Sequence, residues 1–488
     1  MVYRTMACMA AFFSLIVFQA MTLGLQAEET AAVKKAADIL IDAVHANDYS
    51  DFGLQPDLYD YHRTCGFRRG FEFLGHCGVR IARHETRLLT GEKLRSHRLL
   101  FINLVSGERP PFLVSEVNAI VQFIREGGSL LLVTEHSNTY YHMHRLLPLL
   151  AELDIEGFLD TACDVSPHTL GSGNGWVAVE SFREHPVTAG LRRIALQTGG
   201  CVDPRFAVAF TSEKSWADAW VTSEYGESNA PGFFGNFQRD PGERGGPLGV
   251  VMAKEFGQGR IVVVADQNFF SDTFINYADN YRLWLNTISW LLRDEHLNDP
   301  AAYRRFLPRR VLLLEDFELA TFGSDDRFGC VNLMGFLSRY YWVFADNRSA
   351  TEPDGRAVDD LIVLPNGHFE LTPDILKVAV DHLRGGGPVL FLHTFPGAVA
   401  DTSSGVYQTL RAAGLDDPAT ATLSQIDDIR STLTLPDGGS VTLFRPRFSL
   451  YNNAIPDPGR KPNAEQSRVY ESLKKNIDDL LPPLSSAP

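Results

Sequence analysis

Leu99-Leu100-Phe101-Ile102-Asn103 begins the stretch that decides the fold of this chain. Its unbroken apolar residues are typical of a strand buried on both faces. After a loop, the amphipathic pattern of residues 115–124 predicts a helix with Ser115 at its N-cap. Gly127-Gly128 ends that helix, and Leu130-Leu131-Leu132-Val133-Thr134 predicts a second buried strand. Strand, crossover helix and strand make a βαβ unit, which implies a parallel sheet covered on both faces.

The same pattern recurs in the second half of the chain. Leu361-Ile362-Val363-Leu364-Pro365 predicts a buried strand, and a helix follows that begins at Thr372-Pro373 and runs to Leu383. Gly385-Gly386-Gly387 ends this helix, and Val389-Leu390-Phe391-Leu392-His393 predicts the next strand. The chain therefore contains two copies of one unit.

Upstream elements complete both copies. We expect an α/β protein of two tandem flavodoxin-like domains, each built on a doubly wound parallel sheet. The second copy ends in a predicted hairpin over residues 431–445, turned by Pro436-Asp437-Gly438-Gly439. The upstream elements are residues 38–44, a helix around 66–74 and a strand at 79–81 in the first copy, and a strand at 310–314, a helix at 331–339 and a strand at 341–344 in the second.

The N-terminal segment has the pattern of an export signal. Arg4 precedes an apolar run from Cys8 to Leu25, and Leu25-Gln26-Ala27 fits a cleavage site. We expect a signal peptide over residues 1–27 and a periplasmic or secreted protein, with an uncleaved membrane anchor as the alternative. The expected order is then a first domain over 28–297, a shorter second domain over 305–455, and a loose C-terminal tail over 456–488 around one short helix.

The amino-acid composition limits the classes of function that this chain can have. Hydrophobic residues make up 44% and charged residues 22% of the 488 residues, as in folded proteins with a buried core. The formal net charge is -15, which argues against a nucleic-acid binder with its basic face. The expected partners are a small molecule, a glycan or an envelope protein, with a membrane only if the signal segment is retained.

Three separated segments of the first half resemble a known family. They are His185-Pro186-Val187-Thr188-Ala189-Gly190-Leu191, the run from Gly257-Gln258-Gly259 to Asp266, and a helix-like run from Asp279 to Leu291. Together they resemble the class I glutamine amidotransferase-like superfamily, in particular its exported, catalytically degenerate branch. That branch is akin to trehalose-utilisation-like proteins and to accessory domains of transport and gliding systems. The resemblance implies the flavodoxin-like fold, places His185 in the wall of a pocket, and suggests carbohydrate or cell-envelope ligands.

The residues at the position of the family nucleophile exclude amidotransferase activity. The family has a cysteine at a glycine-flanked elbow after the strand that follows the Gly-Gly helix end. That position reads Thr134-Glu135-His136-Ser137-Asn138 in the first copy and His393-Thr394-Phe395-Pro396-Gly397 in the second. Neither has the cysteine, and no glycine flanks Ser137.

Polar residues follow the predicted strands, where doubly wound sheets bind ligands. Glu135, His136 and Asp266 are the candidates for acid–base catalysis. The candidate ligand-binding residues are Asn103, Glu135, His136, His185, Asp266 and Asn268. Other strand ends carry His45, Asn47, Asp48, Ser106, Glu315, Asp316, Asn366, His368, His393 and Thr394.

The segment from Glu135 to His144 suggests a metal site. Glu135, His136, His142 and His144 offer one carboxylate and three imidazoles, which suits a zinc ion that activates water. The spacing is not HExxH, and residues two apart lie on different faces of a helix. The alternatives are ligand hydrogen bonding by Glu135 and His136 without a metal, and a structural histidine-rich loop. No nucleotide cofactor follows from Gly257-Gln258-Gly259, which is expected to form a tight turn between two strands.

Two further features stay open. Cys65 with Cys77, or Cys163 with Cys201, could form a disulfide, and buried reduced thiols are the alternative. Residues 229–247, rich in glycine, proline and arginine, could form a lid or a partner surface. Their phenylalanines could instead hold the loop in place, and we favour that interpretation.

Three function classes fit these patterns. The first is an exported, non-catalytic binding or accessory protein with a degenerate amidotransferase-like cleft, and we favour it. The second is a metal-dependent or acid–base hydrolase acting on a sugar-type substrate. The third is a structural scaffold for interactions between proteins.

Overall fold

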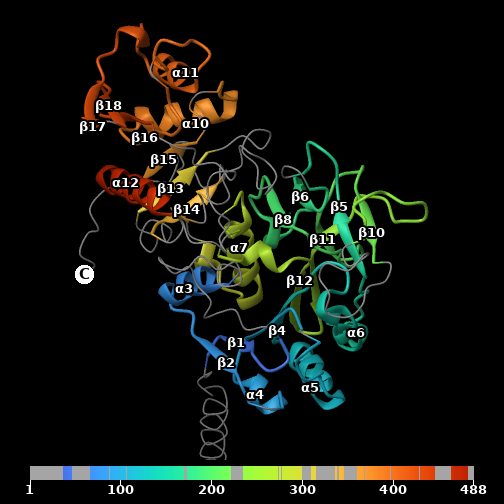
Figure 1. The fold of residues 1–488 in the computed structure, drawn as a ribbon. Helices are drawn as coiled ribbons and strands as arrows, with labels where there is room; N and C mark the ends of the chain where they lie inside the picture. The colour runs from blue at the N-terminus through green and yellow to red at the C-terminus, as the bar shows by residue number, and fades with distance from the viewer. Residues whose placement is uncertain are drawn as a thin grey trace, which may run out of the picture.

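The computed structural model contains two large sheets, each flanked by helices (Figure 1). The N-terminal segment expected to be a signal peptide lies outside the described residues. No helix among the described residues is long and apolar enough to cross a membrane. The structure describes residues 37–46, 66–86, 88–105, 107–169, 173–220, 235–272, 274–275, 277–298, 309–314, 333, 336–337, 340–345, 360–365, 367, 369–395, 397–427, 429–445 and 463–481.

The first sheet has eight strands in the order β2-β1-β3-β4-β12-β11-β9-β7. The first five are parallel and the last three extend the sheet antiparallel. The strands are β1 (Ile39–Asp42), β2 (Ile81–His84), β3 (Leu99–Asn103), β4 (Ser129–Val133), β7 (Ser181–Phe182), β9 (Ala207–Phe210), β11 (Gly249–Phe256) and β12 (Gly259–Val264).

The second sheet repeats this strand order with seven strands, β14-β13-β15-β16-β19-β18-β17. Its first five strands are also parallel, and β18 and β19 form the expected hairpin. Both parallel sets have the flavodoxin-like order 2-1-3-4-5. The elements are β13 (Arg310–Leu313), β14 (Trp342–Ala345), β15 (Leu361–Leu364), β16 (Pro388–Phe391), β17 (Ser424–Asp427), β18 (Arg430–Thr434), β19 (Ser440–Phe444), α10 (Pro373–Arg384), α11 (Gly405–Ala412), η5 (Pro418–Thr420) and α12 (Ala464–Leu480).

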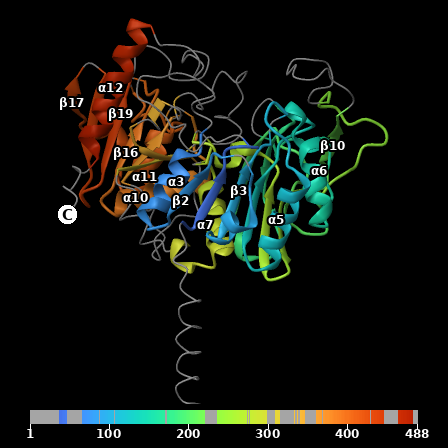
Figure 2. The same cartoon turned by 90° about the horizontal axis from the view of Figure 1, so that it is seen from below.

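Helices cover both faces of the first sheet, as a doubly wound fold requires (Figures 1 and 2). Helices α5 and α7 each contact β4 and β12. Helix α3 packs on α7 so closely that a Cβ on Gly70 would lie 3.0 Å from Trp284 Cε2. The helices are α3 (Arg68–His76), α4 (Gly91–Arg95), α5 (Val114–Arg125), α6 (His142–Glu152) and α7 (Asn280–Leu292).

Two expected boundaries are wrong for local reasons. Helix α5 begins before Ser115, because the Glu116 carboxylate, not a serine hydroxyl, accepts the N–H of Leu113 at 2.8 Å. Val79 does not begin β2. Its N–H bonds the carbonyl of Leu74 at 2.9 Å and closes helix α3, so the strand starts at Ile81.

Small sheets and short helices between β4 and α7 lie next to the first sheet. Strands β5 (Asp160–Cys163) and β10 (Trp216–Ala219) form one antiparallel pair, and β6 (Trp176–Val179) and β8 (Ile194–Gln197) form another. The short helices are η1 (Thr139–Tyr141), η2 (Pro186–Thr188), η3 (Gln267–Phe270) and, after α7, η4 (Glu295–Asn298).

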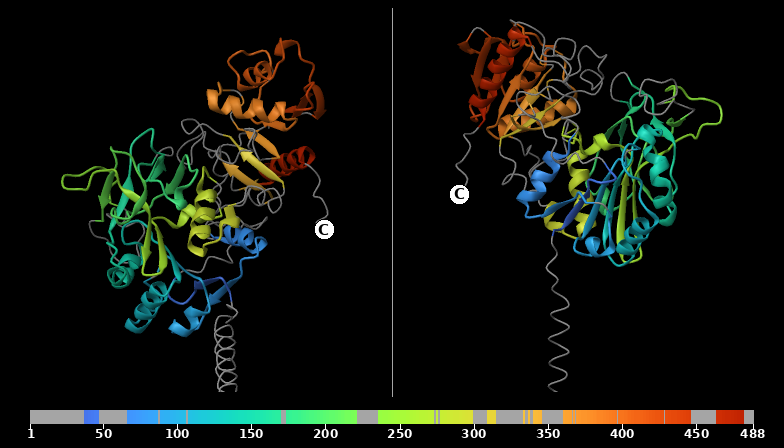
Figure 3. Two further views of the ribbon diagram at one scale, coloured as in Figure 1. Left: turned by 180° about the vertical axis from the view of Figure 1, so that it is seen from behind. Right: turned by 60° about the horizontal axis from the view of Figure 1, so that its bottom comes forward.

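The two domains share part of their core. Arg69 of α3 donates from Nη1 to the carbonyl of Tyr341 at 2.9 Å, and its guanidinium carbon lies 5.0 Å from the Trp342 ring centroid. Figure 3 shows α3 on the side of the first sheet that faces the second. One buried apolar cluster contains residues from both halves: Ala178, Ala195, Phe274, Tyr277, Ala278, Val311, Leu313, Val343, Leu361 and Val363.

Helix α12 belongs to the same cluster, although a loose tail was expected around it. Tyr470, Leu473 and Ile477 are buried in that cluster, and the Tyr470 ring stacks on Phe336 with centroids 4.2 Å apart. The helix itself was predicted correctly, and it packs on the second domain.

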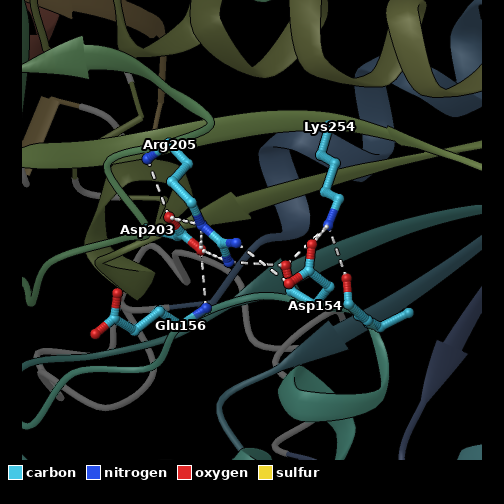
Figure 4. Close-up of polar contacts among 6 residues, drawn as sticks. Asp154, Glu156, Asp203, Arg205 and Lys254 are labelled. Atoms are coloured by element: carbon cyan, nitrogen blue, oxygen red, sulfur yellow. Dashed lines mark hydrogen bonds and ion pairs between the residues drawn. The ribbon is translucent and has the colours of Figure 1, made fainter.

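An ion-pair network ties the loop after α6 to the loop before β9 and to β11 (Figure 4). Arg205 Nη2 lies 2.7 Å from Asp203 Oδ2, and Arg205 Nη1 lies 3.2 Å from Asp154 Oδ1. Lys254 Nζ lies 3.2 Å from Asp154 Oδ2. Lys254 pairs with Ile261 in the first half of β12, so this network does not lie at the carboxyl end of that strand.

Candidate functional site

The candidate site is built at the carboxyl ends of β4 and β12. The N–H of Thr134 bonds the carbonyl of Val264 at 2.9 Å and joins the two strand ends. Glu135 and Asp266 follow directly, and both side chains are buried. The sheet topology therefore brings together two of the three acid–base candidates from positions 131 residues apart in the sequence.

Asp266 is held by backbone donors on both carboxylate oxygens. Its Oδ1 accepts the N–H of Asn268 at 2.6 Å and caps η3, and its Oδ2 accepts the N–H of Gln197 at 2.6 Å. Burial raises the pKa of Asp266 to about 7, against the lowering effect of these two donors.

Glu135 lies beside Asp266 in a similar environment. Its Oε1 accepts the N–H of His136 at 3.1 Å, and its carboxylate also accepts the N–H of Gln267. Burial, and then the negative charge of Asp266, raise the pKa of Glu135 well above its usual range. Because two adjacent buried carboxylates cannot both ionise cheaply, at most one of the two is ionised near neutral pH.

His142 fixes the backbone of this loop. Its Nδ1 lies 2.7 Å from the carbonyl oxygen of Thr139, which can only accept, so Nδ1 carries the proton. Burial lowers the pKa of His142 to about 4, so the ring is neutral and Nε2 accepts the N–H of Glu135 at 3.2 Å. Both ring nitrogens are thus bonded to backbone.

His136 and Ser137 face hydroxyl groups inside the protein. His136 Nδ1 lies 3.2 Å from both Ser137 Oγ and Thr139 Oγ1, and Ser137 Oγ lies 3.1 Å from Thr161 Oγ1. Burial and the nearby His142 hold the pKa of His136 well below its usual range. Ser137 is fully buried, which argues against its use as a nucleophile.

Residues 197–201, Gln197-Thr198-Gly199-Gly200-Cys201, pass directly over these strand ends, and we call them the strap. The N–H of Gly200 bonds the carbonyl of Ala265 at 2.8 Å. A Cβ on Gly199 would lie 2.9 Å from the Asp266 Cβ, and a Cβ on Gly200 would lie 2.9 Å from the carbonyl oxygen of Glu135. Only glycine fits this close approach of two backbones.

Asp160 and Arg244 hold the far end of the strap, and sequence reasoning missed this pair. Asp160 Oδ1 accepts the N–H of Cys201 at 3.1 Å, and Asp160 Oδ2 lies 2.5 Å from Arg244 Nη2. The guanidinium carbon of Arg244 lies 3.9 Å from the Phe158 ring centroid. The two partners are 84 residues apart, so no local pattern could have revealed them. The Gly199-Gly200 doublet was the available signal for the strap.

The remaining ligand-binding candidates divide between the carboxyl ends and the amino ends of the strands. Asn268 bonds the carbonyl of Gln197 at 3.3 Å and belongs to the site, and buried Asn103 pairs with Val133 at the end of β4. His185 lies elsewhere. Its ring centroid is 4.8 Å from that of Trp290, whose carbonyl bonds Arg260 near the start of β12. His185 Nδ1 accepts the N–H of Val187, so this residue caps η2, and it lies near the amino ends of the strands.

The four residues proposed as metal ligands do not converge. Among the described residues, no group of three or more His, Cys, Asp and Glu side chains is arranged to hold a metal ion. Backbone groups engage both nitrogens of His142. His144 is exposed, with Nδ1 at 3.1 Å from Asn138 Nδ2 and its ring against Trp220. A structural role explains these histidines better than a zinc site does.

A second polar cluster lies at the end of β1. His45 Nδ1 lies 2.9 Å from Asp42 Oδ2, and His45 Nε2 lies 3.4 Å from Glu116 Oε2. The two carboxylates outweigh burial and raise the pKa of His45. All three are buried, and Glu116 also bonds the backbone at the start of α5, so the cluster joins two elements. Asn47, Asp48, Ser106, Glu315, Asp316, Asn366 and His368 lie outside the described residues.

The cysteines and the glycine-rich insertion are only partly described. Cys77, Cys163 and Cys201 are free thiols, and burial raises the pKa of Cys201 well above its usual range. Cys65, Cys330 and residues 221–234 lie outside the described residues. Within the described part of the insertion, Asp218 accepts the N–H of Phe237 at 2.6 Å, and a Cβ on Gly175 would lie 2.8 Å from the Phe237 ring. Phe237 therefore holds this loop in place.

Comparisons with known proteins give no family assignment. No family model matches the chain, and no curated protein matches it. Similar solved structures include the mmIFT52 N-terminal domain, with 15% identity and a TM-score of 0.37 over 52% of this chain and 97% of that one. They also include a ThuA-like protein from Bacteroides uniformis (15% identity, TM-score 0.30, 53% and 94% covered) and another from Parabacteroides merdae (12%, 0.28, 52% and 89%). These TM-scores are too low to support a conclusion about function.

Proposed function

We propose that this chain is an exported, non-catalytic binding or accessory protein. It binds its ligand at the carboxyl ends of β4 and β12 in its amidotransferase-like first domain. One observation carries the proposal. Glu135, His136 and Asp266 are all buried, the two carboxylates are occupied by backbone donors, and the strap lies over them. A catalytic acid or base must instead reach a substrate proton.

The proposed class of ligand follows from the residue types around these strand ends. Asp160, Glu135 and Asp266 supply carboxylate oxygens, which accept hydrogen bonds, and Asn268 supplies an amide. Hydroxyl groups of a carbohydrate or of a cell-envelope glycan would complement them. The export pattern of residues 1–27 and the family resemblance agree with such a ligand.

An acid–base hydrolase is the second candidate, and the carboxylate pair favours it. Burial raises the pKa of Asp266 to about 7, so one member of the pair holds a proton at the pH where a general acid must be protonated. A substrate must displace the strap before any chemistry, as a ligand must in the binding role.

The test measures binding and turnover in one sample. Residues 28–488 are titrated with a library of glycans and envelope fragments by calorimetry, and the recovered ligands are analysed for cleavage. We expect saturable binding with the ligand recovered intact. Cleavage that disappears in Glu135→Gln, but persists in the surface variant Glu156→Gln, would replace the binding role with the hydrolase.

A further inference from the structure

We propose that His45 is a buried imidazolium that clips the end of β1 to the start of α5. The charge on its ring makes this clip sensitive to pH. The inference concerns other strands than those of the proposed ligand site, and it does not depend on the proposed function.

Both ring nitrogens of His45 face a carboxylate. Nδ1 lies 2.9 Å from Asp42 Oδ2, and Nε2 lies 3.4 Å from Glu116 Oε2. The Phe112 ring stacks on the imidazole with centroids 4.3 Å apart, which fixes the ring between the two acids. The three polar side chains are each 3% exposed or less, so bulk water does not screen these contacts.

The carboxylate oxygens of this cluster act as acceptors. Asp42 Oδ1 accepts the N–H of Val44 at 3.0 Å. Glu116 Oε1 and Oε2 accept the N–H groups of Leu89 and Leu113, each at 2.8 Å. A neutral imidazole has one N–H and can bond only one of the two acids, whereas the imidazolium has two. Contacts at both nitrogens therefore favour the charged ring, with an acid on each side of it.

The neighbouring His84 differs from His45 in its partners. It lies opposite Asp42 in the register of β1 and β2, and neither of its buried ring nitrogens has a hydrogen-bond partner among the described residues. Burial lowers the pKa of His84, so this ring is neutral near pH 7. Burial also acts against the charge of His45, but Asp42 and Glu116 outweigh it and raise the pKa.

Two cationic side chains lie on the elements around this cluster. Arg109, which follows β3, donates from Nη1 to the carbonyl of Ala43 at 2.9 Å. Lys93 in α4 lies near enough to His84 for its charge to lower the pKa of that ring further. Both cations oppose a second positive charge on His84. Among the described residues, His45 is the cation that contacts both acids.

The clip lies where the order of the strands reverses. Strand β1 lies between β2 and β3, and doubly wound sheets of this order bind ligands beyond the carboxyl ends of β1 and β3. Glu116 joins three segments there, because it contacts His45 after β1 and bonds Leu89 before α4 and Leu113 before α5. Loss of the ring proton would weaken the junction of these segments.

The sign of the pH effect follows from proton linkage. The pKa of His45 is raised in the folded protein, so its contribution to stability is complete below the ordinary value of 6.5 and is lost as the pH rises through the folded value. Between these two values the folded state binds more protons than the unfolded state. The unfolding constant should therefore rise by up to about tenfold per pH unit for this one proton.

Nitrogen-15 NMR of the full chain, labelled at histidine, tests the charge directly. The His45 signals are identified by nuclear Overhauser contacts with the Phe112 ring. We expect both ring nitrogens to carry a proton at about pH 7, with a titration midpoint above 6.5. In Glu116→Gln, which keeps an amide oxygen and removes the negative charge, the midpoint should fall. A neutral His45 ring at about pH 7, or a midpoint that does not move in Glu116→Gln, would overturn the proposal.

Urea unfolding from about pH 6 to pH 9 tests the effect on stability. The wild type should lose stability with rising pH relative to His45→Gln, whose amide does not titrate. His296 is an exposed histidine in η4, and His296→Gln should keep the wild-type slope. Equal slopes in the wild type and His45→Gln would contradict the clip. If His45→Gln does not fold, the ring signals of the wild type and of Glu116→Gln decide the question.

Discussion

Gly200 lies against the backbone of Glu135, at a distance where a Cβ would meet the Glu135 carbonyl oxygen at 2.9 Å. This contact joins a loop between β8 and β9 to the end of β4. It places backbone where doubly wound sheets bind their ligands, and it explains why polar residues at these strand ends are buried.

Gly200→Ala should destabilise the protein by about 1–3 kcal/mol, because the added methyl group overpacks a closed contact. Urea unfolding provides the measurement. Gly75→Ala in α3 is the matched control, since a Cβ there meets nothing within 4 Å. It should be neutral or stabilise the helix by up to about 1 kcal/mol. Equal effects of the two substitutions would show that the strap does not pack as described.

His142→Ala should cost about 1–3 kcal/mol of stability, because it leaves the buried N–H of Glu135 without its acceptor. His144→Ala, on the exposed side of the same helix, should change stability by less than about 0.5 kcal/mol. Thermal unfolding compares the two. The metal content of the purified variants should equal that of the wild type, and loss of bound zinc in both would restore the metal hypothesis.

Glu135→Gln should make stability less dependent on pH. Burial, and then the charge of Asp266, raise the folded pKa of Glu135 well above its usual range, so its contribution to stability is largest at low pH, below its unfolded pKa, and is lost as the pH rises. Glutamine does not titrate, so the variant lacks this contribution and its pH dependence. Unfolding free energies at pH 5 and pH 8 give the difference. A variant that loses as much stability as the wild type between these values would show that Glu135 does not titrate with a raised pKa.

Arg69→Ala should weaken the contact between the two domains by about 1–3 kcal/mol, because it removes a hydrogen bond to Tyr341 and the stacking on Trp342. Its neighbour Arg68 is the control, since Arg68 forms a half-exposed ion pair with Glu72 that contributes less than about 1 kcal/mol. Chemical denaturation of both variants makes the comparison. A larger loss in Arg68→Ala would contradict the described interface.

The sequence predicted the sheets well, because their strands are long apolar runs separated by glycine-ended helices. Leu99–Asn103 and Leu361–Leu364 lie in the expected strands, and the strand order follows from the βαβ units. The predicted helix start at Ser115 was wrong. Ser115 fits an N-cap and Glu116 fits the third helical position, and only the path of the backbone decides where the helix begins.

The site was predicted only in part. Glu135 and Asp266 were found because each follows a buried strand, and parallel strands end at one edge. The strap and the Asp160–Arg244 pair depend on loop paths that no local pattern encodes. His185 was misplaced for the same reason, since its segment packs on the end of α7, at Trp290, near the start of β12.

The most direct test of the proposed non-catalytic role is to follow a bound glycan over time with residues 28–488. We predict saturable binding, with the glycan recovered intact after prolonged incubation. Multiple turnover of the glycan, abolished in a folded Glu135→Gln variant, would contradict the account and identify the carboxylate pair as catalytic.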